Sequence, residues 1–218
     1  MPFLAHRVTF VCEANICRSP LMAYTFEAGE DPLPGAWAVT SRGVNVVEER
    51  RGMCGLSASL IKDEWGGPEF VQAQQATPMT AVHLDAQDMI LVAGRAERAE
   101  VARISPGTRS RTFTLREAIA LGDESVTSAE FDVQAEEGDG GRSLFNRYVE
   151  ILNRRRSYIT LPRAGAPRLW RRSVPDPLDI LDAHHLGRKE HLEMLQSLRE
   201  DARALRSQLS RFLAPEPR

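Results

Sequence analysis

The sequence has few cysteines, few lysines and no long hydrophobic run, and each scarcity excludes a class of protein. Only Cys12, Cys17 and Cys54 occur among 218 residues, and an odd number of cysteines without a secretory leader argues against a secreted domain held by disulfides. No stretch is long and apolar enough to cross a bilayer. We therefore expect a cytoplasmic protein without a membrane partner, in which a free cysteine can serve as a nucleophile.

An excess of charge of one sign is also lacking. The 28 basic and 30 acidic residues give a formal net charge of −2, so the chain has no overall basic field of the kind that binds nucleic acid. Apart from Lys62 and Lys189, every basic residue is an arginine. The length and the ordinary apolar fraction are typical of a globular domain that can bury a core.

Short apolar runs alternate with helix-like segments in the first half of the chain. The predicted strands cover residues 8–11, 35–43, 89–93 and 112–115, and the predicted helices cover residues 21–28, 95–104 and 116–121. Continuously apolar strands are typical of a parallel sheet covered on both faces. The alternation implies right-handed crossovers. It predicts an α/β fold, a doubly wound four-stranded parallel sheet with helices on both faces.

A single domain is expected over residues 1–213, with an inserted segment at about 122–173 and a disordered tail at 214–218. The acidic, glycine-rich residues 122–142 predict a mobile surface loop. Two amphipathic helices are predicted at 144–158 and 186–213. Their apolar faces are expected to contain Leu144, Tyr148, Ile151 and Leu152 in the first helix, and Leu192, Leu195, Leu198, Leu205, Leu209 and Phe212 in the second.

A candidate phosphate-binding loop follows the first strand, at the strand end where doubly wound sheets bind ligands. It runs from Cys12 to Arg18 and Ser19, with five intervening residues: Glu13, Ala14, Asn15, Ile16 and Cys17. Five residues can wrap so that their backbone N–H groups point at one anion, and the helix that begins near Arg18 adds its positive end. The planar guanidinium of Arg18 matches two phosphate oxygens.

The same positive field favours the thiolate form of Cys12, which is the nucleophilic form. Ser19 could donate a hydrogen bond to Cys12, and Asn15 suits a left-handed backbone position in the loop. The competing interpretation is that Cys12 is a buried core cysteine. The strand before the loop and the helix after it favour the functional interpretation.

The segment VCEANICRSP at residues 11–20 resembles the signature loop of the low-molecular-weight protein tyrosine phosphatases, which in that family also follows the first strand. The family carries its general acid in an Asp-Pro dipeptide near the C-terminus, and this chain has Asp176-Pro177. An aspartate before proline is otherwise a common turn residue. The two motifs stand in the family's order, and the resemblance spans most of residues 7–121 and 174–212.

The resemblance implies metal-independent hydrolysis of phosphate monoesters, most specifically of phosphotyrosine in proteins. Cys12 would form a cysteinyl-phosphate, Arg18 and the loop would stabilise the transition state, and Asp176 would act as general acid and then as base. The substrate-binding residues would be Glu13, Ala14, Asn15, Ile16, Cys17 and Ser19. No cofactor is expected, and the partner would be a phosphorylated protein bound by a monomer or weak dimer.

Several positions bear on specificity and regulation in the resembling family. Relatives specific for phosphoarginine tend to have threonine where this chain has Ile16, so isoleucine indicates phosphotyrosine. Leu178 stands where relatives often have an aromatic residue, and Gln74 stands where they often have a histidine that supports the loop serine. Cys17 could form a reversible disulfide with the nucleophile or could simply pack in the loop. Cys54 is expected to be structural.

No metal site is expected. His184 and His185 lie near Asp179 and Asp182 in the sequence, but adjacent residues do not converge on one helix face.

Two other functions stay open. An arsenate reductase on the same fold would need further cysteines after the nucleophile, and Cys54 is the only one beyond the loop. A non-catalytic module that binds phosphorylated ligands would need Arg18 but neither Cys12 nor Asp176.

Overall fold

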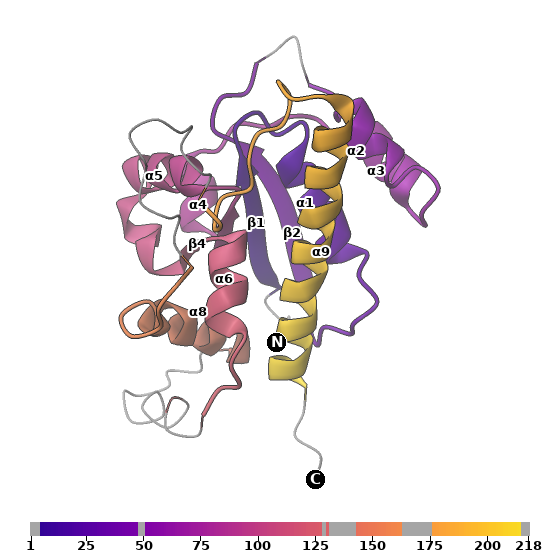
Figure 1. Ribbon diagram of the computed structural model, residues 1–218. Coiled ribbons are helices and arrows are strands. Elements are labelled where there is room, and N and C mark those ends of the chain that lie inside the picture. Colours follow the sequence, from indigo (N-terminus) through magenta and orange to yellow (C-terminus); the bar gives the residue numbers. More distant parts are fainter. Residues whose placement is uncertain (1–4, 48–50, 128–129, 131–142, 163–175, 215–218) are drawn as a thin grey trace.

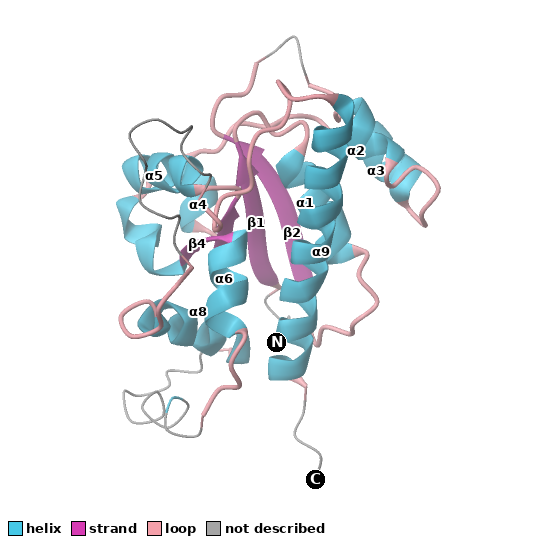
Figure 2. Cartoon of the chain, in the orientation of Figure 1, coloured by secondary structure: helices cyan, strands magenta, loops and turns pink. Residues whose placement is uncertain are grey.

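The computed structural model describes residues 5–47, 51–127, 130, 143–162 and 176–214. Its centre is a parallel sheet in the order β2-β1-β3-β4, and Figures 1 and 2 show β1 and β2 side by side between the helices. The strands are β1 (His6–Cys12), β2 (Trp37–Gly43), β3 (Met89–Val92) and β4 (Thr112–Thr114). The predicted four-stranded parallel sheet is thereby confirmed.

The pairing register aligns the carboxyl ends of the two longest strands. Cys12 at the end of β1 pairs with Gly43 at the end of β2, and Val11 pairs with Val92 at the end of β3. The loops that follow these three strands therefore meet at one edge of the sheet, as a doubly wound fold requires of a ligand site.

Helices cover both faces of the sheet. One face is covered by α1 (Arg18–Glu27), α6 (Leu115–Gly122), α8 (Leu144–Arg155) and α9 (Arg188–Leu213), and the other by α4 (Ala81–Asp85) and α5 (Arg95–Ile104). The 3₁₀ helix η1 (Pro106–Arg111) leads into β4. Helix α9 runs beside α1 along its length (Figure 1).

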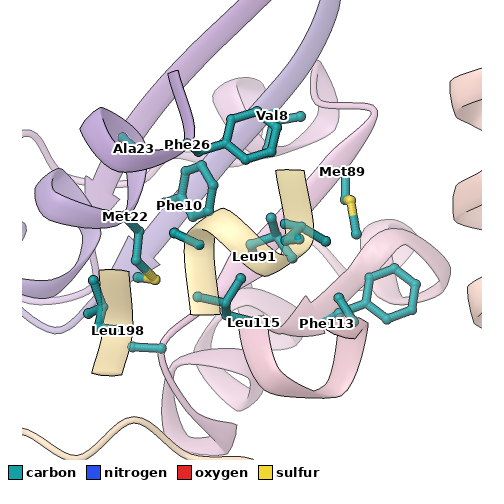
Figure 3. Close-up of a cluster of buried hydrophobic side chains, with 14 of the residues drawn as sticks. Val8, Phe10, Met22, Ala23, Phe26, Met89, Leu91, Phe113, Leu115 and Leu198 are labelled. Carbon is teal, nitrogen blue, oxygen red and sulfur yellow. The ribbon is translucent and has the colours of Figure 1, made fainter. Parts of the chain in front are cut away.

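Alternate residues of each strand face the two helical layers. Val8 and Phe10 join the larger cluster with Leu91 and Leu198 (Figure 3), whereas Val11 faces the smaller cluster on the opposite side. All five side chains are completely buried. The central strand β3 is apolar at every position, which explains its continuous run in the sequence.

Two short helices, α2 (Gly55–Ser59) and α3 (Gly67–Ala73), lie with α4 between β2 and β3 and were not predicted. Helices of five to seven residues are too short to show a helical period. Helix α4 has an N-cap in the sequence, because the Thr80 hydroxyl accepts a hydrogen bond from the backbone N–H of His83.

The described part of the insertion belongs to the main core. Helix α8 buries Phe145, Tyr148, Val149, Ile151 and Leu152. The predicted burial of Leu144 is wrong: it is 46% exposed, because it is the first helical residue after the cap of Ser143 and Phe145 takes the inward position. Most of the predicted mobile loop, and the predicted tail beyond residue 214, lie outside the described residues.

The buried stripe of α9 is close to the prediction but begins one residue earlier. His191 is buried at its first turn, where the apolar pattern predicted Leu192. Within the residues that the structure describes, no helix is long and apolar enough to span a membrane.

Candidate active site

The loop of residues 12–17 joins β1 to α1 at the carboxyl edge of the sheet. Its carbonyl groups are turned outward and accept hydrogen bonds from the surroundings. Donors to the carbonyls of residues 12, 13, 15 and 16 are Val44 N (3.0 Å), Asn45 N (2.7 Å), Gln74 Nε2 (3.1 Å) and Cys54 N (2.6 Å). No amide of residues 13–17 donates to a partner in the described part of the chain. The free amides can therefore gather around one anion.

Asn15 fixes the shape of the loop. Its backbone has φ of 56°, the left-handed conformation predicted for it. Its buried side chain donates to Ser19 Oγ (2.9 Å) and Ser41 Oγ (2.8 Å) and accepts from Thr77 N (2.8 Å). Asn15 thus ties the loop to β2 and to the segment before β3.

Cys12 lies at the bottom of the loop and is 2% exposed. Its Sγ is 3.1 Å from Ser19 Oγ, in agreement with the predicted contact. The Ser19 hydroxyl oxygen accepts a hydrogen bond from the Asn15 amide. Its own hydrogen can therefore be donated to the Cys12 sulfur or to the carbonyl of Arg42 at 3.2 Å. The sulfur therefore has a hydroxyl as a polar neighbour, although Cys12 is buried and belongs to the main core cluster.

Arg18 is 4% exposed, and its charge is opposed by carboxylates. Nη1 lies 3.2 Å from Glu97 and donates to the carbonyl of Ile180 at 2.9 Å, while Nη2 donates to Asp182 at 2.9 Å. Burial acts against its charge, but Cys12, Glu97 and Asp182 raise the pKa of Arg18 above its usual value. The guanidinium is therefore fixed and charged, with Cys12 among its electrostatic neighbours.

The carboxylates around Arg18 differ in surroundings. Burial raises the pKa of Glu97, although Arg18 opposes this. Burial also acts to raise the pKa of Asp182, but the backbone N–H of His184 and the charge of Arg18 lower it below its usual value. Neither residue was predicted as part of the site. The signal for Glu97 was its place in the helix that follows β3, beside the carboxyl end of β1.

Asp176 is placed near Arg95 rather than against Cys12 or Arg18. Its carboxylate forms a 2.8 Å ion pair with Arg95 Nη1 and accepts from the backbone N–H of Leu178. Arg95 also binds Asp179. The backbone of Ile180 bridges Ala93, at the end of β3, and Arg18, so the segment carrying Asp176 runs along the edge of the site.

Gln74 supports the loop, but through a different atom from the one expected. Its amide donates to the carbonyl of Asn15 and not to Ser19, because Asn15 and Arg42 already occupy the serine hydroxyl. Ile16 is partly buried against the main core.

The Cys17 side chain points out of the loop. Its Sγ is 3.2 Å from both Ser57 Oγ and His191 Nε2, and the three cysteines are free thiols. A hydrogen bond from Cys17 lowers the pKa of Cys54 to about 4, so these two sulfurs are neighbours. The sequence pattern gave no indication of this arrangement.

Comparison with known proteins agrees with this architecture. No family model matches the chain. It is 25% identical over 152 residues to a protein-arginine-phosphatase from Geobacillus stearothermophilus, covering 68% of this chain and 97% of that protein.

Solved structures give the same fold. A mutant of YwlE from Bacillus subtilis matches with a TM-score of 0.57 and 17% identity over 94% of this chain and 99% of its own. The low-molecular-weight protein tyrosine phosphatase from T. tengcongensis matches with a TM-score of 0.56 and 16% identity over 92% and 97%. The chain thus shares its fold with the low-molecular-weight protein tyrosine phosphatases, carries two motifs that resemble theirs in the same order, and is similar in sequence to a phosphatase that it matches almost end to end.

Proposed function

We propose that this chain is a phosphatase that hydrolyses phosphotyrosine in proteins, with Cys12 as the nucleophile and a cysteinyl-phosphate as the intermediate. The observation that carries the proposal is the loop of residues 12–17, whose carbonyls face outward while its amides are free, with Arg18 beside the sulfur. We further propose that it acts in the cytoplasm, as a monomer or weak dimer, on phosphorylated protein partners.

The two halves of the reaction use the same groups. The loop amides and Arg18 hold the phosphate, and the Cys12 sulfur attacks phosphorus in line while the ester oxygen leaves. Charge spread over the phosphoryl oxygens in the transition state is stabilised by donors already in position. Ser19, 3.1 Å from the sulfur, stabilises the thiolate when water displaces it from phosphorus.

Glu97 and Asp182 are proposed as positioning residues for Arg18. They occupy the outer edges of its guanidinium through Nη1 and Nη2, whereas Nε makes no hydrogen bond to a described residue. The remaining N–H groups form the planar fork that phosphate binding needs.

We assign Asp176 as general acid and base. It lies on the segment at the rim of the site, and in this structure Arg95 holds its carboxylate. For Asp176 to protonate the leaving oxygen, substrate must draw it from Arg95, whose side chain is half exposed and hence able to move. Asp179, bound by the same arginine, is its matched control.

The mechanism is tested with two aryl phosphates that differ in leaving group. Cys12→Ser is expected to abolish turnover of both. Asp176→Asn is expected to slow phenyl phosphate by about 100-fold or more but p-nitrophenyl phosphate much less, because nitrophenolate leaves without a proton. Asp179→Asn should show no such dependence. If Asp182→Asn shows it and Asp176→Asn does not, the assignment of the general acid is wrong.

The same variants separate the alternative functions. A non-catalytic module that binds phosphorylated ligands would show no turnover in the wild type, and full activity in Cys12→Ser would refute the proposed nucleophile. An arsenate reductase would oxidise thioredoxin in the presence of arsenate, which this proposal does not expect.

Phosphoarginine is the second candidate substrate, because the curated relative is named a protein-arginine-phosphatase. Ile16 favours the aromatic substrate, since its apolar side chain suits a ring and offers no acceptor to a guanidinium. Turnover of phosphotyrosine, phosphoserine and phosphoarginine peptides in EDTA tests this directly. We expect the highest kcat/KM for phosphotyrosine and a shift towards phosphoarginine in Ile16→Thr; a preference of the wild type for phosphoarginine would overturn the substrate assignment.

A further inference from the structure

Two cysteines and two histidines from four separate segments meet beside the phosphate-binding loop. They are Cys17 in the loop, Cys54 before α2, His184 in the segment after Asp176, and His191 in the first turn of α9. Figure 1 shows the start of α9 next to α2, although the two helices are far apart in the sequence. We refer to these four residues as the Cys₂His₂ cluster.

The distances within the cluster are those of ligands to one ion. One ligand atom from each residue lies within 4.8 Å of all the others, and Cys17 Sγ is 3.2 Å from His191 Nε2. Tetrahedral zinc with its usual bond lengths places sulfur and nitrogen ligands about 3.3–3.8 Å apart. Small side-chain adjustments would bring the cluster to this geometry.

We propose that Cys17, Cys54, His184 and His191 bind a structural zinc ion. Two thiolates and two imidazoles form one of the ligand sets that zinc prefers, and softer sulfur ligands disfavour magnesium and calcium. Four protein ligands leave no open coordination position, so the ion takes no part in phosphate hydrolysis. The proposal is independent of the proposed substrate and nucleophile.

A carboxylate behind one ligand supports the assignment. Asp182 Oδ1 is 3.1 Å from His184 Nδ1, which leaves Nε2 of that ring for the metal. Histidine ligands of zinc usually donate their second N–H to such a carboxylate. The other oxygen of Asp182 binds Arg18, so the cluster is connected to the phosphate clamp through one side chain.

Sequence reasoning missed this site because it considered the adjacent pair His184 and His185. Only His184 belongs to the cluster; its second histidine is His191, seven residues further on and buried at 6% exposure. His191 Nε2 lies 3.2 Å from the buried Cys17 sulfur, and a shared ion would account for this contact.

The zinc would have two effects on the loop. It would fix Cys17, and with it the backbone between Cys12 and Arg18, to α2 and α9. It would also hold the Cys17 sulfur away from Cys12, so that the loop disulfide considered for this family would require loss of the metal.

The first experiment measures metal in the full chain, purified with a tag that contains no histidine and without added chelator. We expect about one zinc per chain by elemental analysis and by native mass spectrometry. Cys54→Ser and His184→Gln, at partly or fully exposed positions, are expected to lower zinc affinity by at least about 100-fold while keeping the far-ultraviolet circular dichroism of the wild type. His185→Gln and Cys12→Ser are the matched controls and should retain the metal.

Cobalt replacement gives a readout that needs no activity. Co²⁺ added to the zinc-depleted chain should give the intense visible bands of tetrahedral cobalt and a thiolate charge-transfer band, both lost in Cys54→Ser. Asp182→Asn should weaken zinc binding by about 10–100-fold without removing it.

Three results would overturn the proposal. The first is a wild-type chain that has no stoichiometric zinc and gives no thiolate–cobalt band. The second is an equal zinc content in the wild type, Cys54→Ser and His184→Gln, and the third is a disulfide between Cys17 and Cys54 in a chain purified under reducing conditions. We expect Cys12→Ser to lose turnover and to retain zinc. This result would support the nucleophile and the zinc site independently of each other.

Discussion

Replacing Asn15 by alanine tests whether the phosphate-binding loop is held by one side chain. Asn15 is fully buried, makes three side-chain hydrogen bonds and has φ of 56°. Alanine removes all three bonds and must still adopt the left-handed backbone, which asparagine tolerates better than other residues with a side chain.

The magnitude follows from these two terms. Each lost hydrogen bond costs about 1 kcal/mol net, and more where a buried partner is left without one. The left-handed backbone adds about 1 kcal/mol for alanine. We expect Asn15→Ala to lower the free energy of unfolding by about 3–5 kcal/mol, a large part of the roughly 5–15 kcal/mol of a typical domain.

Two further variants separate the terms. Asn15→Gly loses the side chain but has no penalty at positive φ, so it should be about 1 kcal/mol more stable than Asn15→Ala, the reverse of the usual order. Asn15→Asp keeps the acceptor for Thr77 N–H but replaces both donors by a buried carboxylate, and should be less stable than the wild type.

The assay is equilibrium unfolding in urea, followed by tryptophan fluorescence and circular dichroism on all four proteins. A loss below about 1 kcal/mol for Asn15→Ala, or alanine more stable than glycine, would refute the argument that this residue shapes the loop.

Two other predictions concern stability. Arg155 is almost completely buried, and its hydrogen bonds hold the pKa of Glu130 well below the usual 4.5. Glu130→Gln should lower the free energy of unfolding by about 2 kcal/mol at pH 7. Because the folded-state pKa is depressed, this contribution is present above pH 4.5 and is lost as the pH falls further, so urea midpoints of wild type and variant should converge in acid; parallel curves would contradict the pairing. Gly43→Ala should lower the free energy of unfolding by about 1–3 kcal/mol, because its Cβ would lie 3.0 Å from the Ala14 backbone and 2.7 Å from Val46. An unchanged midpoint of thermal unfolding would show that the loop can move to accommodate the methyl group.

Much of the fold could be predicted because its signals are local. Strand β3 is buried on both faces, so residues such as Ile90 and Leu91 form a run that is visible in the sequence. The helix at Arg95–Ile104 was predicted with its observed limits. The short helices between β2 and β3 were not, because they depend on caps and tertiary contacts rather than on period.

The partners of the site residues could not be predicted for a different reason. Glu97 lies in a charged helix, whose composition predicts an exposed position. It is instead buried, where its carboxylate pairs with Arg18 at the start of α1. In the same way, the sequence cannot show whether the Cys17 side chain faces Cys12 or His191. A motif specifies the residue types and the backbone path, while the direction of each side chain is set by segments far away in the chain.

Asp182 links the phosphate clamp to the proposed zinc, and this link makes a last prediction. One of its oxygens binds Arg18 and the other His184, so the ion and a phosphate bound at Arg18 stabilise the same arrangement. By linkage, zinc must then raise phosphate affinity by the factor by which phosphate raises zinc affinity. Calorimetric titration of inorganic phosphate into Cys12→Ser, with and without zinc, should show at least about fivefold tighter binding with the metal. The coupling should disappear in a chain that also carries Asp182→Asn. Equal phosphate affinities in both metal states would show that the aspartate joins two sites that do not influence each other.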